Sequence, residues 1–212
     1  MGVTCVCQWP PVEGKSVQQS IEQLHKRLEG LGATKQGTFV VDCESFHHCA
    51  PSSGQQQKTL YVMHSTEFPL SCFALYEGGP CMTADASFTA LMLRLKGAFQ
   101  NAKGSKVEAR GQRYRYADFY VRLGAVTIGP NTKGVSVEVE YCPSMVPADC
   151  WGLLQEFTQS FMGSNGPLVP PTCASRHDGA PPYNPSDTMI QYMELFNRMR
   201  KHHAQSSNIS IR

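Results

Sequence analysis

Two pairs of acidic residues have the spacing of a metal-binding strand. Glu138 and Glu140 lie in GVSVEVEYC, and Asp42 with Glu44 repeats the spacing in VVDCE. Because side chains in a strand alternate between its two faces, each pair presents both carboxylates on one face. Paired carboxylates are suitable ligands for a divalent metal ion. The pattern is therefore compatible with a metal-dependent hydrolase.

A pair of arginines could complete such a site. Arg113 and Arg115 share one face of RYRY, and Tyr114 and Tyr116 share the other. Arginines bind phosphate, so a barrel interior that carries both groups would suit a triphosphate. A nucleic-acid site is a weaker interpretation, because the stacking tyrosines would point away from the arginines. An ordinary half-buried strand with a solvated face gives the same period without chemistry, and we favour that interpretation.

Cysteine and histidine side chains form a second candidate site, for zinc. They are Cys43, His47, His48 and Cys49 of DCESFHHC, with Cys5 and Cys7 as further donors. Their spacing does not match the C-x2-C pairs of structural zinc sites. Most of the nine cysteines also lie at apolar positions, where cysteine behaves as a small hydrophobic residue. We expect free thiols in a reducing compartment, with no metal or cofactor.

The first residues, MGVTCVC, invite comparison with a lipid-anchored start. Val6 stands where myristoylation requires Ser or Thr, and Lys15 is the first basic residue. Alternation of Val3 and Cys5 with Thr4 instead predicts a buried strand that ends before Pro10.

Composition excludes several classes of protein. The chain has 212 residues, of which 41% are hydrophobic and 17% charged, which is typical of a globular protein. A net charge of +2 is too small to indicate nucleic acid as the main partner. No secretory signal and no transmembrane segment is recognisable, so we expect a soluble intracellular protein.

Periodicity places these candidates on strands of a larger sheet. Strands are expected at 3–8, 37–43, 58–65, 70–77, 105–111, 112–129 with a break near Gly124, and 134–142. Helices are expected at 16–32 with His25 on the solvated face, at 85–103 with Asp85 as N-cap, from Pro147, and from Ser186 as N-cap.

The order of these elements predicts an α+β fold. We expect one domain over 1–203, an antiparallel β-barrel-like sheet with helices packed outside. A mobile Pro/Gly-rich loop is expected at 163–185, and a flexible C-terminal tail at 204–212. We interpret the apolar stripe of the last helix as core, with a groove for another protein as the alternative; the stripe comprises Met189, Tyr192, Met193, Phe196 and Met199.

Long stretches of the sequence resemble the Mediator subunit 20 family. They are MGVTCV, GKSVQQSIEQLHKRLEGLGA, KQGTFVVDCE, YVMHSTEFPLSCFAL and DTMIQYMELFNRMRK. The resemblance implies a barrel similar to Mediator subunit 18 and to tunnel-type RNA triphosphatases. It also implies a non-enzymatic nuclear subunit of the Mediator head module, paired with subunit 18 and tethered through subunit 8. Such a subunit would support RNA polymerase II transcription, without binding membrane, sequence-specific nucleic acid or a small-molecule substrate.

The resemblance also bears on the carboxylates. The tunnel-type enzymes hold their metal with E-x-E pairs on two strands, one of them early in the chain. The early strand VTCVCQ has no acidic residue, so Glu138 and Glu140 would be half of a site. We therefore expect no catalytic residues; a metal-dependent triphosphatase remains the alternative, and the residues that contact a partner stay undefined.

Overall fold

Strands and helices follow one another over most of the chain. The structure, a computed structural model, describes residues 2–11, 14–49, 59–76, 78–102, 106–163 and 181–209, with side chains described as far as Lys201. The strands are β1 (Val3–Trp9), β2 (Thr34–His48), β3 (Thr59–Ser65), β4 (Ser71–Tyr76), β5 (Cys81–Asp85), β6 (Phe99–Asn101), β7 (Val107–Tyr116), β8 (Phe119–Ile128) and β9 (Asn131–Tyr141). The helices are α1 (Val17–Gly30), α2 (Phe88–Arg94), α3 (Pro147–Met162) and α5 (Pro185–Ile209).

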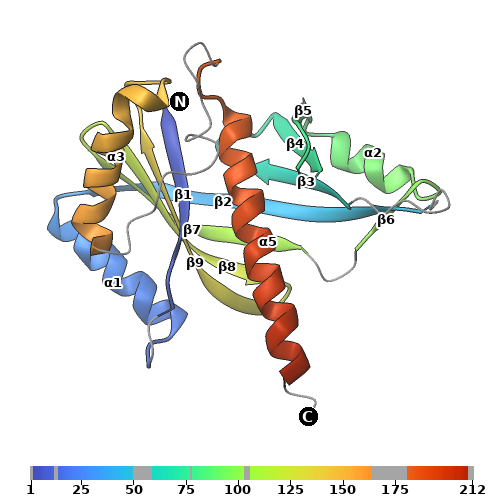
Figure 1. Cartoon of the computed structure of the whole chain (residues 1–212), viewed down its shortest axis with the longest axis horizontal. Helices are drawn as coiled ribbons and strands as arrows, with labels where there is room; N and C mark the ends of the chain where they lie inside the picture. The colour runs from blue at the N-terminus through green and yellow to red at the C-terminus, as the bar shows by residue number, and fades with distance from the viewer. Residues whose placement is uncertain are drawn as a thin grey trace.

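The strands form one antiparallel sheet that curls into a half-barrel (Figure 1). Its order is β1-β9-β8-β7-β2-β3-β4-β5, and the short β6 pairs with β2. Helix α5 lies along the open side of the half-barrel, where it contacts both edge strands, β1 and β5. The predicted fold class, an antiparallel barrel-like sheet with helices packed outside, is confirmed.

The inner face of the sheet packs against α5. The predicted apolar stripe of this helix is buried, and its members Tyr192 and Phe196 lie in one apolar cluster with Phe39, Val41 and Met63 of the strands. The interpretation of this stripe as core is confirmed. Since α5 occupies the open side, both faces of the central strands are shielded from water.

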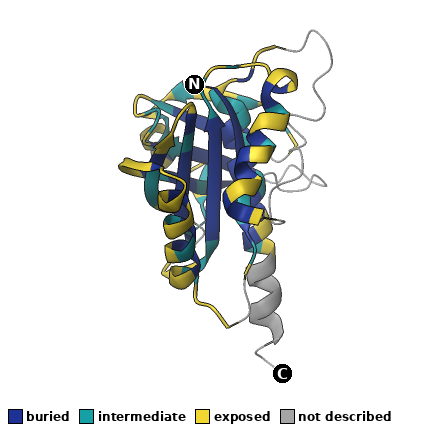
Figure 2. Cartoon of the chain, turned by 90° about the vertical axis from the view of Figure 1, so that its left-hand side faces the viewer, coloured by how far each residue is buried: buried dark blue, intermediate teal, exposed yellow. Residues whose placement is uncertain are grey.

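The outer face of the sheet packs against α1 and α3. Leu24 and Leu154 join Val3 of β1 and the valines of β9 in a second apolar cluster, which Figure 2 shows as buried strands beneath partly exposed helices. Helix α1 begins as predicted, because Ser16 and Gln19 form a reciprocal capping box. His25 does not lie on a solvated face as expected: it is half-buried, with Nδ1 2.8 Å from the hydroxyl of Tyr114.

The helix predicted at 85–103 is much shorter in the structure. Asp85 belongs to β5, α2 ends at Arg94, and Phe99–Asn101 form β6 against β2. The helical spacing in this range comes from Phe88, Leu91, Met92, Leu95 and Phe99, and of these only Met92 is fully buried. Strand pairing with β2 therefore overrides the helical period after Gly97.

The strand predicted at 112–129 breaks at a different place. The chain reverses at Ala117 and Asp118, between β7 and β8, and Gly124 lies inside β8 opposite Gly111. A Cβ atom on Gly124 would lie 2.8 Å from the Cζ atom of Phe39. Gly124 is thus required for close packing beneath Phe39 and not for a turn.

The predicted loop 163–185 lies largely outside the described residues, whereas residues 204–209 of the predicted tail belong to α5. Residues 164–180 and 210–212 are not among the described residues, so the mobility of 163–185 and of 204–212 stays a prediction. Helix α5 starts earlier than predicted: Asn184 Oδ1 accepts from the backbone N–H of Ser186, and Asp187 Oδ2 accepts from that of Asn184. Asn184 therefore caps the helix, and Ser186 lies within it.

Among the described residues, every helix is too short or too polar to cross a membrane.

Candidate functional site

Strand β9 carries Glu138 and Glu140 on the inner face of the sheet. Its valines point into the cluster beneath α1 and α3, so the two carboxylates point the other way, toward α5. The prediction that this face of the strand is solvated is wrong, because Glu138 is only 5% exposed and Glu140 only 7% exposed. Two carboxylates so far from water require charged or hydrogen-bonding partners.

Arg122 of β8 is the first of those partners. It lies opposite Glu138 in the sheet and is only 4% exposed. Its Nη1 atom lies 2.7 Å from Glu138 Oε1 and 3.0 Å from Glu140 Oε2. A guanidinium group thus bridges the two carboxylates at the position where a bound cation would lie.

A second carboxylate–arginine pair adjoins this group. Glu67, in the loop between β3 and β4, accepts from Arg122 Nη2 at 2.8 Å and from Arg113 Nη1 at 3.1 Å. The guanidinium groups of Arg113 and Arg122 both lie over the ring of Tyr120, 5.7 and 5.8 Å from its centroid. The loop is therefore tied to the strands by charge. We call Glu67, Arg113, Arg122, Glu138 and Glu140 the ion cluster.

The buried part of the ion cluster has perturbed protonation equilibria. Burial raises the pKa of Glu138, while Arg122 and the Tyr192 hydroxyl, 2.6 Å away, oppose this effect by donating to the ionised carboxylate. Burial would lower the pKa of Arg122, but its contacts with Glu138, Glu67 and Glu140 outweigh that effect and raise it. Burial and the nearby Glu138 raise the pKa of Tyr192, so its hydroxyl remains a donor.

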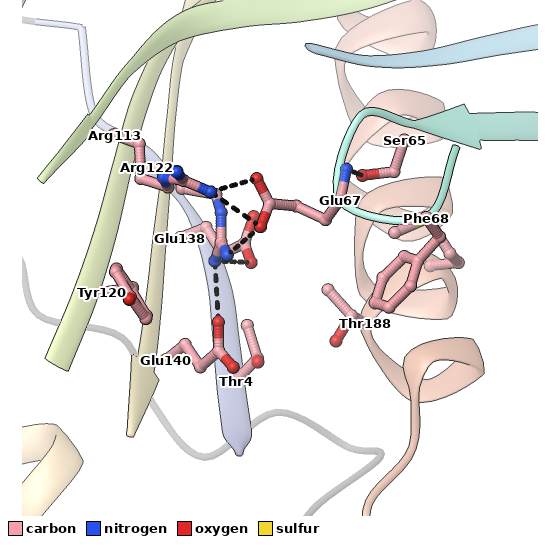
Figure 3. Close-up of a pocket in the computed structure, with 11 residues that line it drawn as sticks. Thr4, Ser65, Glu67, Phe68, Arg113, Tyr120, Arg122, Glu138, Glu140 and Thr188 are labelled. Atoms are coloured by element: carbon pink, nitrogen blue, oxygen red, sulfur yellow. Dashed lines mark hydrogen bonds and ion pairs between the residues drawn. The ribbon is translucent and has the colours of Figure 1, made fainter. Parts of the chain in front are cut away.

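The ion cluster forms one wall of a pocket of about 310 Å³ between the sheet, the β3–β4 loop and α5 (Figure 3). The lining residues outside the ion cluster are Thr4, Ser65, Phe68, Tyr120, Thr188 and Met189. Hydroxyl groups and two apolar side chains therefore face the charged wall.

The carboxylates of the ion cluster are already satisfied by donors of the chain. Arg113 and Arg122 donate to Glu67, Arg122 and Tyr192 to Glu138, and Arg122 to Glu140. The remaining oxygen of Glu140, Oε1, accepts from the backbone N–H of Gly2 at 2.9 Å. Within the described residues, no group of three or more His, Cys, Asp and Glu side chains could hold a metal ion. The arrangement is that of an internal ion network.

The second predicted carboxylate pair lies elsewhere. Neighbouring Val41 packs on the inner face, so Asp42 and Glu44 point to the outer one. Asp42 pairs with Lys106 at 3.3 Å, and Glu44 accepts from the amide of Asn101 at 2.9 Å. The structure therefore does not bring the two acidic pairs together.

The arginines and tyrosines of RYRY separate as the alternation predicts. Arg113 points to the inner face, whereas Tyr114 is buried beneath α1. Arg115 is exposed, although its guanidinium lies 5.7 Å from the ring of Tyr120. Tyr116 stacks on Phe157 of α3, with centroids 5.5 Å apart. Tyrosines and arginines do not form a shared stacking surface for bases.

The candidate zinc donors are also dispersed. Cys43 packs in the inner cluster beside Arg200, whereas Cys5 belongs to the outer cluster. His47 contacts Thr59, and Cys49 Sγ lies 3.7 Å from the carbonyl oxygen of Lys96. Burial raises the pKa of the Cys43 thiol, which disfavours the thiolate that metals bind.

Sequence reasoning did not single out Arg122 or Glu67. Arg122 had a usable signal, because it interrupts the apolar run of FYVRLGAVTI, and a buried arginine requires an acidic partner. Glu67 had none, since its loop meets β8 only through the curvature of the sheet.

Comparisons with known proteins identify the family. Residues 1–197 match the model described as TATA-binding related factor (TRF) of subunit 20 of Mediator complex. The chain is 60% identical over 203 residues to Mediator of RNA polymerase II transcription subunit 20 from Gallus gallus, which covers 95% of both chains. It is 59% identical over 204 residues to the Homo sapiens protein of that name, again covering 95% of both chains.

Likeness to solved structures is weaker. The PH1012 protein from Pyrococcus horikoshii OT3 superimposes with a TM-score of 0.43 and 16% identity, covering 76% of this chain and 90% of that one. That similarity is too low to indicate function. The matched family model and the relatives establish that the chain belongs to the Mediator subunit 20 family and is a component of the Mediator complex.

Proposed function

We propose that this chain is a non-catalytic subunit of the Mediator head module in the nucleus. It pairs with Mediator subunit 18, is tethered through subunit 8, and supports regulated transcription by RNA polymerase II. Family membership supports the general assignment. The observation that favours a role without catalysis is the ion cluster, in which Arg122 occupies the position of a bound cation.

Strand β1 supports the same conclusion. It is the neighbour of β9, and the residues that face Glu140 and Glu138 across the pair are Thr4 and Val6. A second carboxylate pair, which a divalent metal would need, is not present on this strand. The half-barrel therefore serves as a scaffold, and its interior is filled by internal ion pairs and by α5.

Exposed apolar side chains support association with a partner. Several lie on β4, β5 and α2 or beside them; they are Leu70, Met82, Leu91, Leu93 and Leu95. Leu70 is 82% exposed. Exposed apolar side chains on consecutive elements of the chain favour a contact with another protein.

Size-exclusion chromatography tests the proposed pairing. The chain is run by itself, with Mediator subunit 18, and with an unrelated barrel protein of similar size. We expect a one-to-one complex with subunit 18 only. A stable monomer that ignores subunit 18 would contradict the pairing.

Phosphate release tests the catalytic alternative. The chain and a Glu138→Ala variant are incubated with a nucleoside triphosphate and Mg²⁺ or Mn²⁺. We expect no turnover by either protein above the buffer rate. Release that depends on Mn²⁺ and disappears in Glu138→Ala would establish the triphosphatase and refute the non-catalytic role.

A further inference from the structure

The pocket beside the ion cluster has unbonded donors on its wall, whereas the carboxylate acceptors of that wall are all bonded. Each carboxylate oxygen of Glu67, Glu138 and Glu140 accepts a hydrogen bond from the chain. The Nε atoms of Arg113 and Arg122, by contrast, are buried and have no hydrogen-bond partner among the described residues. A ligand that suits this wall must therefore bring an acceptor rather than a cation.

The two unbonded donors belong to neighbouring side chains. Arg113 and Arg122 are directly opposite each other in the β7–β8 pair, so their side chains leave one face of the sheet side by side. Both line the pocket, and Figure 3 shows them across it from Phe68 and Thr188. A guanidinium N–H that is buried without an acceptor destabilises the fold. An oxyanion in the pocket would remove that penalty at both arginines.

The charges around the pocket are compatible with one further negative charge. Arg115 also lies over the ring of Tyr120, so three guanidinium groups there oppose the three carboxylates of the ion cluster. Burial raises the pKa of Glu138, and a proton bound there would make the sum of the charges positive. A monoanion therefore suits this wall. A triphosphate does not, because its several negative charges would lie close to Glu67, Glu138 and Glu140.

The rest of the pocket limits the size and the polarity of the ligand. Its volume of about 310 Å³ is at the small end of the range for ligand pockets. Phe68 of the β3–β4 loop and Met189 of α5 add apolar surface to its lining. A short alkyl chain attached to the oxyanion would fit these side chains.

We propose that this pocket binds a small aliphatic monocarboxylate as a ligand that is not chemically changed. The carboxylate accepts from the Nε–H groups of Arg113 and Arg122, and the alkyl chain packs against Phe68 and Met189. Such a ligand joins the sheet, the β3–β4 loop and α5, so its binding stabilises the folded chain. This binding does not require the proposed pairing with subunit 18.

Titration of the full chain with butyrate tests the site. Chloride is lowered as butyrate is raised, so that the ionic strength stays constant, and heteronuclear NMR of the arginine side chains reports on each Nε–H group. We expect saturable shifts of the Nε–H signals of Arg113 and Arg122, with the signal of the exposed Arg110 unchanged. Signals of Arg113 and Arg122 that stay in place, or that move together with that of Arg110, would overturn the proposal.

Three further probes define the class of ligand. Butanol has the alkyl chain without the charge, and triphosphate has the charge without the chain, so neither should displace butyrate. N-acetylleucine represents the carboxyl end of a peptide, and it should bind more weakly than butyrate because its amide would be buried against Phe68 and Met189. Tighter binding of triphosphate or butanol would overturn the monocarboxylate. Tighter binding of N-acetylleucine would overturn the small ligand in favour of a peptide.

Two substitutions on different elements test the contacts. Arg113→Lys keeps a cation beside Glu67 but removes the Nε–H group, and we expect about tenfold weaker binding of butyrate. The matched control is Arg110→Lys on the outer face of β7, which should bind butyrate as the parent protein does. Phe68→Ala should weaken the binding of butyrate and leave that of acetate, which lacks the longer chain, unchanged. Butyrate binding that Arg113→Lys leaves intact, or equal weakening of both acids by Phe68→Ala, would overturn the proposed contacts.

Discussion

Arg122 is a buried, paired charge that contributes little net stability although its removal is costly. Its ion pairs are made at the expense of desolvating three charged groups, so the network as a whole contributes little net stability. Removing one partner has a much larger effect, because the others remain buried without compensation. Removing Arg122 is therefore expected to lower the free energy of unfolding by much more than the intact network contributes to it.

We predict that Arg122→Met destabilises the protein by about 3–5 kcal/mol, because Glu138 and Glu140 lose their shared cation. Urea denaturation followed by tryptophan fluorescence measures the change. Arg110→Gln is the matched control, since Arg110 is largely exposed and its pair with Glu108 is worth about 0–1 kcal/mol. Equal effects of the two substitutions would show that the ion cluster is not energetically coupled.

A half-buried histidine gives the fold a second charge-dependent contact. Burial lowers the pKa of His25 below its ordinary value of 6.5, and the nearby Lys35 adds to the effect. Below pH 6.5 the unfolded chain binds a proton at His25 more readily than the folded protein does. The free energy of unfolding therefore falls as the pH drops from 6.5 toward the folded pKa.

We predict that His25→Gln reduces the loss of stability between pH 7.5 and pH 5. Urea unfolding at several pH values measures this slope. His48→Gln, on an exposed position of β2, serves as the control and should retain the original slope. A slope that is unchanged in His25→Gln would assign the acid sensitivity to other groups.

At the residue scale, sequence could predict which side chains share a face and could not predict what covers that face. The spacing of Glu138 and Glu140 correctly placed both carboxylates together. The same spacing also suggested a solvated face. In the sequence, a strand whose polar face is covered by a distant helix has the same alternation as a strand whose polar face meets water. The charged Arg122 within the apolar sequence of β8 was the local indication that another element covers this face.

At the element scale, the local sequence pattern was sufficient to predict an element where residues within that element determine its ends and faces. The capping box at Ser16 fixed the start of α1, and the valines of β9 fixed its faces. The predicted end of the helix at 85–103 and the predicted strand break near Gly124 were wrong, because pairing with other strands determines where these elements end. Ala117, in the turn between β7 and β8, has a positive φ of 47°, a conformation that an alanine in the sequence does not predict.

We predict that Gly124→Ala destabilises the protein by about 1–3 kcal/mol, because the new methyl group would overlap Phe39 and the backbone of Arg110. The shift in thermal midpoint measures it. Gly97→Ala is the control, since a methyl group added there would meet no atom within 4 Å and the φ of Gly97 is not positive. If both variants matched the parent protein, close packing at the β7–β8 pair would not limit stability.

At the scale of the whole molecule, α5 completes the barrel that the strands leave open. It supplies Tyr192 and Phe196 to the inner core, and its Gln191 side chain bonds the backbone of β1 at Thr4 and Val6. An amide side chain thereby takes the place of a neighbouring strand at the sheet edge. Such a cover protects the edge from pairing with other chains.

We predict that α5 is indispensable and that the residues after His203 are not. A chain ending at residue 184 should lack a cooperative thermal transition, since the inner core and the β1 edge are both uncovered. A chain ending at residue 203 should unfold within about 2 °C of the full protein, because the last α5 residue in the described inner core is Met199. Differential scanning calorimetry of both chains distinguishes these outcomes. A cooperative transition in the shorter chain would show that the sheet folds without the helix on its open side.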